Sequence, residues 1–235
     1  LDLETTGLDQ RSFEASGTGR RETMDKIVGY CIAPSTTKGW YIPVRHREKG
    51  AEANVPPRKV AEMVTKIQAG GAKAVFHNAK FDQKFLSFDP AGESGQWDDV
   101  NMWEDTLILA YLRNSRERSK GLKALSKKEL DREMIELKEL FPPEAIKAKK
   151  MDYSTLDPTW EPVVWYAAAD AVNTLALFHI LHPSVVEKDA FGRDQEGLYR
   201  IEKACLRATI WMEDCRIRID RDRLENLIRL GQKEW

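Results

Sequence analysis

The sequence has few cysteines, no long apolar run and no excess of either charge, and each shortage excludes a class of protein. The 235 residues include three cysteines, an odd number without metal-ligand spacing, which favours a reducing compartment. No uninterrupted apolar run approaches the ~18 residues of a membrane-spanning helix, and no basic segment followed by an apolar core opens the chain. The 37 Lys and Arg against 38 Asp and Glu give a net charge of −1, which excludes a strongly basic nucleic-acid binder.

What is present is a chain with enough apolar residues, 42%, to build a core. Alternating and helical periodicities predict a meander of strands, followed by strands that alternate with helices. The predicted strands cover 1–5, 27–33, 40–44, 74–77 and 102–103, with a loop over 9–26; the predicted helices cover 56–68, 106–112, 162–181, 198–212 and a segment from 221, after a short strand near 216–219. This order indicates a mixed α/β sheet covered by helices. Because the strand pattern is under way at the first residue, the sequence is expected to be a fragment.

Three groups of polar residues stand out from this framework. Asp2 and Glu4 lie two apart on the first strand, so they project from one face, where their charges repel by about 4 kcal/mol at ~4 Å and an effective dielectric of ~20. A bound cation would remove that repulsion. Taken alone, however, such a pair is more often a solvent-facing acidic edge.

The other two groups follow later strands. Asn78 stands where it would cap a helix carrying Asp82, and Tyr166 and Asp170 lie one turn apart on one face of the long predicted helix. Taken alone, Asp82 is explained as a surface residue, and the Tyr166–Asp170 pair as a tyrosine–carboxylate hydrogen bond.

Together and in this order, the groups resemble the DEDD 3′–5′ exonucleases of the tyrosine subgroup. The similarity is greatest to the proofreading domain of family A DNA polymerases. Three motifs carry it, Leu1–Leu8, His77–Asp82 and Tyr166–Asp170, with further similarity at Trp40–Val44 and Glu104–Leu107. Trp165 stands where the histidine subgroup has its histidine, five residues before Asp170, which disfavours that subgroup.

The resemblance implies an RNase H-like α/β fold, with a mixed five-stranded sheet flanked by helices and a helical C-terminal extension. The exonuclease domain is expected over residues 1–183, a linker over 184–197, and the helical start of a truncated polymerase region over 198–235. No polymerase catalytic motif follows, so this chain is not expected to polymerise.

The resemblance also implies a catalytic site for two divalent ions, Mg²⁺ or Mn²⁺. In it, Asp2 bridges the two ions, Glu4 and Asp170 hold one, and Asp82 reaches the other partly through water. Tyr166 orients the attacking water, because a phenol with a pKa of ≈ 10 is a poor base at neutral pH.

Substrate contacts are expected from residues near these motifs: Thr5, Leu8, Asn78 and Phe81. Core packing is the alternative for Leu8 and Phe81. Residues 113–150 hold 12 Lys or Arg against 7 Asp or Glu, and such a segment can follow the phosphates of a single strand or form a solvated helix face. The basic residues considered for this contact are Arg113, Arg116, Arg118, Lys120 and Lys123.

The implied function is metal-dependent hydrolysis of single-stranded or frayed DNA from its 3′ end, which releases nucleoside 5′-monophosphates. The expected partners are that DNA end and the polymerase domain of the parent chain, without a membrane and with the oligomeric state open. The expected location is the cytoplasm of a bacterial or phage-infected cell, with an organelle as the alternative. An RNA-trimming exonuclease and a non-catalytic single-strand-binding or spacer module are the other hypotheses, and the presence of all four carboxylates disfavours the second.

Overall fold

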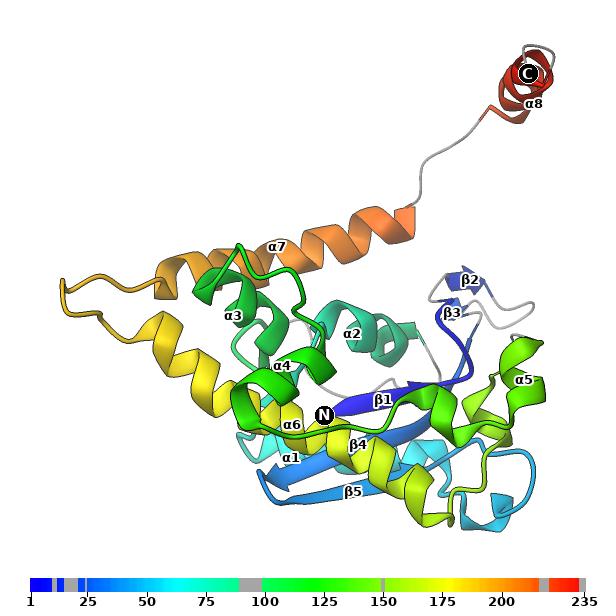
Figure 1. The fold of residues 1–235 in the computed structure, drawn as a ribbon, viewed down its shortest axis with the longest axis horizontal. Helices are drawn as coiled ribbons and strands as arrows, with labels where there is room; N and C mark the ends of the chain where they lie inside the picture. The colour runs from blue at the N-terminus through cyan, green and yellow to red at the C-terminus, as the bar shows by residue number, and fades with distance from the viewer. Residues whose placement is uncertain are drawn as a thin grey trace.

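The centre of the fold is a three-stranded antiparallel sheet with strand order β1-β4-β5 (Figure 1). We analysed a computed structural model, which describes residues 1–9, 12–14, 21–23, 25–88, 99–148, 151–215 and 220–232. The sheet consists of β1 (Asp2–Thr5), β4 (Ile27–Ser35) and β5 (Lys38–Pro43). A parallel pair is formed by β6 (Ala74–Phe76) and β7 (Trp103–Asp105). Within the expected loop over 9–26, the short strands β2 (Ser12–Glu14) and β3 (Arg21–Thr23) pair with each other.

The predicted α/β class is confirmed, but the expected single five-stranded sheet is not formed. All five expected strands exist, and they are hydrogen-bonded as three plus two. β1 and β6 are joined where the Leu1 ammonium donates to the Val75 carbonyl at 2.8 Å.

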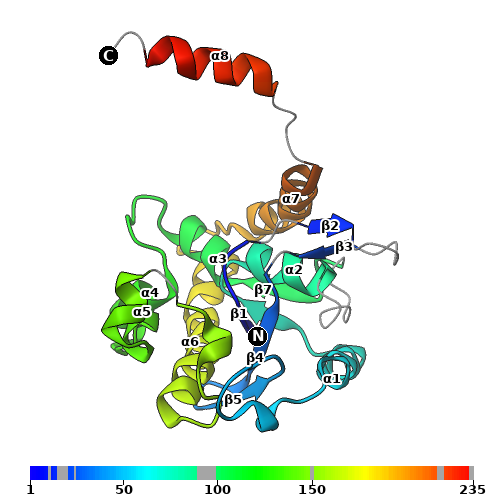
Figure 2. The same ribbon diagram turned by 90° about the vertical axis from the view of Figure 1, so that its right-hand side faces the viewer.

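Helices cover both sides of the sheet. The helices are α1 (Pro57–Ala69), α2 (Ala79–Phe88), α3 (Thr106–Arg113), α4 (Leu122–Leu130), α5 (Pro143–Lys147), α6 (Glu161–Val186), α7 (Glu196–Cys215) and α8 (Arg221–Gly231). Figure 2 shows α1 and α6 on opposite sides of the strands. Leu3 and Tyr30 pack with α1, whereas Val28 and Cys31 pack with α6. Since side chains alternate along a strand, Asp2 and Glu4 lie on the same side as α6.

The long helix α6 runs further than the sequence predicts. The expected end at His182-Pro183 is wrong, because Pro183 lies inside the helix and the buried Val185 holds the last turn in the core. Packing therefore outweighs the cost of proline in a helix. By length and composition alone α6 is apolar enough to cross a membrane, but it packs against β4, β5, α3 and α4, which accounts for its apolar composition.

Helix α7 is attached to the core through a buried ion pair. Lys203 on α7 lies 2.9 Å from Glu104 on β7, and the hydroxyl of Tyr199 donates to the same carboxylate oxygen at 2.9 Å. All three residues are buried. The first half of α7 is therefore packed against the core that contains β7. The short strand expected near 216–219 lies outside the described residues.

Candidate active site

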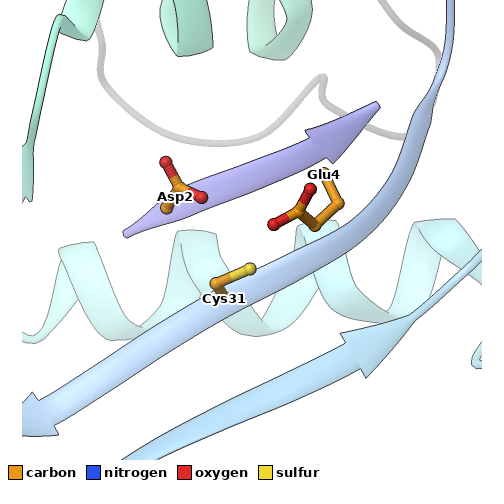
Figure 3. A group of neighbouring side chains, drawn as sticks. All are labelled: Asp2, Glu4 and Cys31. Atoms are coloured by element: carbon orange, nitrogen blue, oxygen red, sulfur yellow. The ribbon is translucent and has the colours of Figure 1, made fainter. Parts of the chain in front are cut away.

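Antiparallel pairing of β1 with β4 places three potential metal-binding side chains on one face. Asp2 lies opposite Cys31, and Glu4 lies opposite Gly29. One carboxylate oxygen each of Asp2 and Glu4 and the Cys31 sulfur all lie within 4.8 Å of one another. Figure 3 shows Asp2 and Glu4 on β1 and Cys31 on the neighbouring β4, with the carboxylate of Glu4 between the two strands.

The other two predicted carboxylates join this group from α2 and α6. Burial raises the pKa of Asp82 and of Asp170 well above the usual range, and in both cases the charge of Asp2 adds to the effect. Asp170 and Asp82 in turn contribute to the raised pKa of Glu4. The charges of Asp2, Glu4, Asp82 and Asp170 therefore influence one another, whereas, among the described residues, the group of donor atoms within 4.8 Å of one another contains only Asp2, Glu4 and Cys31.

The cluster has the chemistry of a site for hard divalent cations. Asp82 is 2% exposed, and the Oδ1 atoms of Asp82 and Asp170 are buried without a hydrogen-bond partner. Buried carboxylates are costly unless a cation or hydrogen bonds compensate them. An all-oxygen set of this kind suits Mg²⁺ and Mn²⁺, so the residues present fit the expected ions.

Asp105 fixes the start of the helix that carries Asp82. Its carboxylate accepts hydrogen bonds from the amides of Asn78 and Ala79, at 3.2 and 2.8 Å, and also from the amide of Leu107 at 2.7 Å. One side chain thus caps both α2 and α3. The Asn78 carbonyl accepts from the Phe81 amide at 2.9 Å, so among the described contacts the side chain that caps α2 is that of Asp105 and not, as the sequence suggested, that of Asn78.

The hydroxyl of Tyr166 is held near the carboxylates by an aromatic layer. Tyr166 is buried, and the centre of its ring lies 6.0 Å from that of Tyr153. Burial, followed by the charge of Glu4, raises the pKa of Tyr166 above its ordinary value. The hydroxyl therefore keeps its proton at neutral pH and can orient a water molecule, but it is a poor base.

Comparison with known proteins adds to this geometry. A family model described as 3′–5′ exonuclease matches residues 1–186. The chain belongs to this family. The family resemblance that the motifs indicated is thereby confirmed. No curated protein matches the sequence.

The carboxylate cluster of this exonuclease is expected to weaken the metal-free fold. Burial raises the pKa of Asp2 to about 6, and Asp82 is shifted in the same direction. A carboxyl group whose pKa is higher in the folded than in the unfolded state lowers stability as pH rises through that range. Metal-free protein should therefore lose stability from about pH 4 upward through pH 6 and above.

The variant Asp82→Asn removes one charge from the cluster at nearly constant volume. At pH 8 without metal, we expect its melting temperature to exceed that of the parent by roughly 5 °C, because repulsion is relieved. The difference should shrink toward pH 4, and Mn²⁺ should raise the melting temperature of the parent more than that of the variant. Thermal unfolding followed by circular dichroism measures both; a less stable variant at pH 8 would contradict the repulsion argument.

Lys123 is a cation at the edge of the exonuclease site. Its Nζ lies 4.9 Å from the centre of the Tyr166 ring and donates to the Ile135 carbonyl at 2.6 Å. Its charge opposes the rise in the pKa of both Glu4 and Asp170. The ammonium group also pairs with Glu136 at 3.3 Å, and its charge would oppose a bound metal ion and favour a phosphate.

Replacing Lys123 by Met separates these two effects. Lys123→Met should bind Mn²⁺ on the order of threefold more tightly and should raise KM for a single-stranded oligonucleotide by a similar factor. Calorimetry and steady-state kinetics measure the two quantities. Lys127→Met is the matched control, because Lys127 lies on the same helix and pairs with the exposed Glu133. Weaker Mn²⁺ binding in Lys123→Met would refute this role.

The expected substrate residues occupy different environments. Leu8 is 83% exposed, so core packing does not explain it. Phe81 packs on the core, with its ring centre 5.1 Å from that of Phe85. Thr5 donates its hydroxyl proton to the Gly7 carbonyl at the end of β1. Asn78 adopts a φ of 72° where the chain turns from β6 into α2. All four lie close in sequence to the carboxylates, and their contact with substrate stays a prediction.

Three of the five basic residues considered for phosphate contact already have partners in the chain. Arg113 pairs with Glu129 at 2.9 Å, and Lys120 donates to the Ser115 carbonyl and stands over the Tyr111 ring. The third is Lys123. Arg116 and Arg118 are exposed. Three of these five charges are therefore engaged within the chain, and contact of the segment with the phosphates of a strand stays a prediction.

Sequence reasoning missed two residues of the site. Asp105 was noted only as part of a family-like segment, and its role as a double cap depends on the parallel pairing of β6 with β7. Cys31 was set aside because the cysteines have no ligand spacing along the sequence. The signal that could have found it is the pairing of two predicted strands, which places Cys31 opposite Asp2.

Proposed function

We propose that this chain is a divalent-metal-dependent exonuclease that removes nucleotides from the 3′ end of single-stranded or frayed DNA. The observation that carries this proposal is the gathering of four carboxylates from β1, α2 and α6, two of them with buried oxygens that lack partners. Family membership supports the direction of hydrolysis. Within the proposal, the strands adopt an RNase H-like arrangement, and residues 198–235 begin a polymerase region in a cytoplasmic parent protein.

Each residue of the proposed site would have its own role in phosphodiester hydrolysis. When bound, two divalent ions supply positive charge to the attacking and leaving oxygens. Asp2 would contribute to holding both ions, Glu4 and Asp170 one of them, and Asp82 the other. A water oxygen forms the new bond to phosphorus as the bond from phosphorus to the 3′ oxygen breaks. The water loses a proton to solvent, and the leaving oxygen gains one, so the products are a nucleoside 5′-monophosphate and a shortened strand.

Tyr166 would orient the attacking water through its hydroxyl, since its raised pKa keeps it protonated. Tyr166→Phe keeps the ring and its packing on Tyr153 but loses the hydroxyl. We expect kcat to fall about 10- to 100-fold with little change in Mn²⁺ affinity, because positioning and not metal binding is lost. Rapid-quench kinetics and calorimetry measure these quantities. A large loss of Mn²⁺ affinity would assign Tyr166 to the metal site instead.

The function is tested with oligonucleotides labelled at one end. With Mn²⁺, a 3′-labelled single-stranded DNA should release labelled mononucleotide at once, whereas a 5′-labelled strand should give a descending ladder. EDTA should stop both reactions, and a mispaired 3′ end should be hydrolysed faster than a paired end, because it is easier to unpair. Preference for an RNA strand would favour the RNA-trimming hypothesis, and binding without hydrolysis would favour the non-catalytic module.

A further inference from the structure

Cys31 places a thiol against the carboxylates of β1. The residue is fully buried, lies directly opposite Asp2 and has its sulfur within 4.8 Å of oxygens from Asp2 and Glu4. Figure 3 shows the sulfur on β4 pointing into the space beside the two carboxylates. A buried cysteine is commonly a small apolar side chain in a core, so its neighbours decide what it can do.

The neighbours of the Cys31 sulfur include carboxylate oxygens of Asp2 and Glu4 on β1. Gly29 lies opposite Glu4 and contributes no side chain, and an added Cβ would lie 2.2 Å from the ring of Tyr41. The ring of Tyr41 therefore covers Gly29, and Figure 3 shows the carboxylate of Glu4 turned toward Cys31. The Oδ1 of Asp82, which is buried without a hydrogen-bond partner, lies outside this group of three donor atoms, but the charges of Asp2 and Asp82 influence each other.

The resulting donor set differs from an all-oxygen set in one decisive way. Sulfur is a soft donor that selects zinc and related ions over magnesium and manganese. Bonds of ~2.3 Å from zinc to sulfur and ~2.0–2.2 Å to oxygen, at tetrahedral angles, place the donors of one ion about 3.4–3.7 Å apart. The three donor atoms lie within 4.8 Å of one another, so side-chain movements of about 1 Å bring them to that separation.

We propose that Asp2, Glu4 and Cys31 form a binding site for a thiophilic divalent ion, Zn²⁺ or Cd²⁺, which competes with the ions that support hydrolysis. Binding forms a metal–sulfur bond and releases the thiol proton to solvent, without any change in oxidation state. The competition rests on the proposed function, because it concerns the same carboxylates. The ion would inhibit the exonuclease by occupying Asp2 and Glu4 in a geometry that the sulfur fixes.

The binding test uses Cd²⁺ alone, whose bond to a thiolate gives an ultraviolet charge-transfer band. The other two cysteines, Cys205 and Cys215, are exposed and are first replaced by serine, so that Cys31 is the remaining thiol. Titration of this protein with Cd²⁺ should produce the band, and adding Cys31→Ser should abolish it. Absence of the band in the protein that retains Cys31 overturns the proposal.

A second variant tests whether the carboxylates share the ion. Glu4→Gln in the same background should weaken Cd²⁺ binding about tenfold or more, since a charged oxygen donor is lost. Unchanged affinity would mean that the thiol binds alone and would overturn the shared site. Circular dichroism spectra compared with those of the parent identify any variant that fails to fold, and Glu4→Asp then provides the same test with its charge kept but its reach shortened.

Inhibition is then measured in relative terms. With Mn²⁺ present, the Cd²⁺ concentration that halves each protein's own exonuclease rate should be about tenfold higher for Cys31→Ser than for the parent. Equal values would overturn the competition. If no variant hydrolyses DNA, the proposed function fails, while the charge-transfer band still decides the metal site.

Discussion

Replacing Asp2 by Asn is expected to reduce exonuclease activity by about 10³-fold or more, equivalent to at least ~4 kcal/mol of transition-state stabilisation. Asp2 lies at the centre of the cluster, because its charge raises the pKa of Glu4, Asp82 and Asp170 alike. An amide at this position removes the charge that would serve both metal ions while keeping the shape of the side chain. Mononucleotide release from a 3′-labelled single strand, at saturating Mn²⁺, measures the loss.

Asp222→Asn is the matched control. Asp222 lies in the exposed first turn of α8, and its substitution should leave the rate within about twofold of the parent. Thermal unfolding of Asp2→Asn should show a folded protein, because the substitution relieves repulsion among buried carboxylates. A folded Asp2→Asn protein that keeps more than about a tenth of the parent rate would exclude the proposed role of Asp2.

Replacing Lys203 by Met should destabilise the protein by about 3–5 kcal/mol, because Glu104 is left buried without its cation. Glu104 and Lys203 are 7% and 6% exposed, so water cannot replace the lost partner easily. Lys73, whose Nζ lies 3.5 Å from the other carboxylate oxygen, is more exposed and compensates only in part. For a chain of this length the expected fall in melting temperature is roughly 10 °C.

Two comparisons make this result specific. Lys127→Met breaks an exposed ion pair and should leave the free energy of unfolding close to that of the parent. The double variant Lys203→Met/Glu104→Gln should recover part of the loss, because the uncompensated charge is gone. Urea denaturation gives the free energies of unfolding. A loss below about 1 kcal/mol in Lys203→Met would show that α7 is not anchored through this pair.

Local sequence patterns predicted the elements that carry the site. Alternation along Asp2–Thr5 and the four-residue spacing of Tyr166 and Asp170 depend on the geometry of one strand and one helix, which a sequence displays directly. The motifs, taken in order, identified the family, and the structure places Asp2 and Glu4 side by side on β1, with the charges of Asp82 and Asp170 acting on Glu4. Their individual roles in binding metal stay predictions.

Features that depend on contacts between elements could not be predicted in the same way. The pairing of β1 with β6 joins segments far apart in the sequence, and the structure shows a bond from the Leu1 ammonium to the Val75 carbonyl in place of a ladder. α6 continues beyond Pro183 because Val185 is buried in the core, and local helix propensity does not predict that burial. Cys31 reaches Asp2 through strand register, and Asp105 caps a helix that begins 26 residues earlier.

The most direct test of the central claim is a count of bound metal ions. Calorimetric titration of the protein with Mn²⁺, in the presence of a deoxynucleoside 5′-monophosphate, should show about two ions per chain, as a two-metal site requires. Asp2→Asn should abolish this binding, whereas Asp222→Asn should retain it. If the parent protein binds no Mn²⁺, or binds it equally well without the Asp2 carboxylate, the cluster is not the metal centre of this exonuclease.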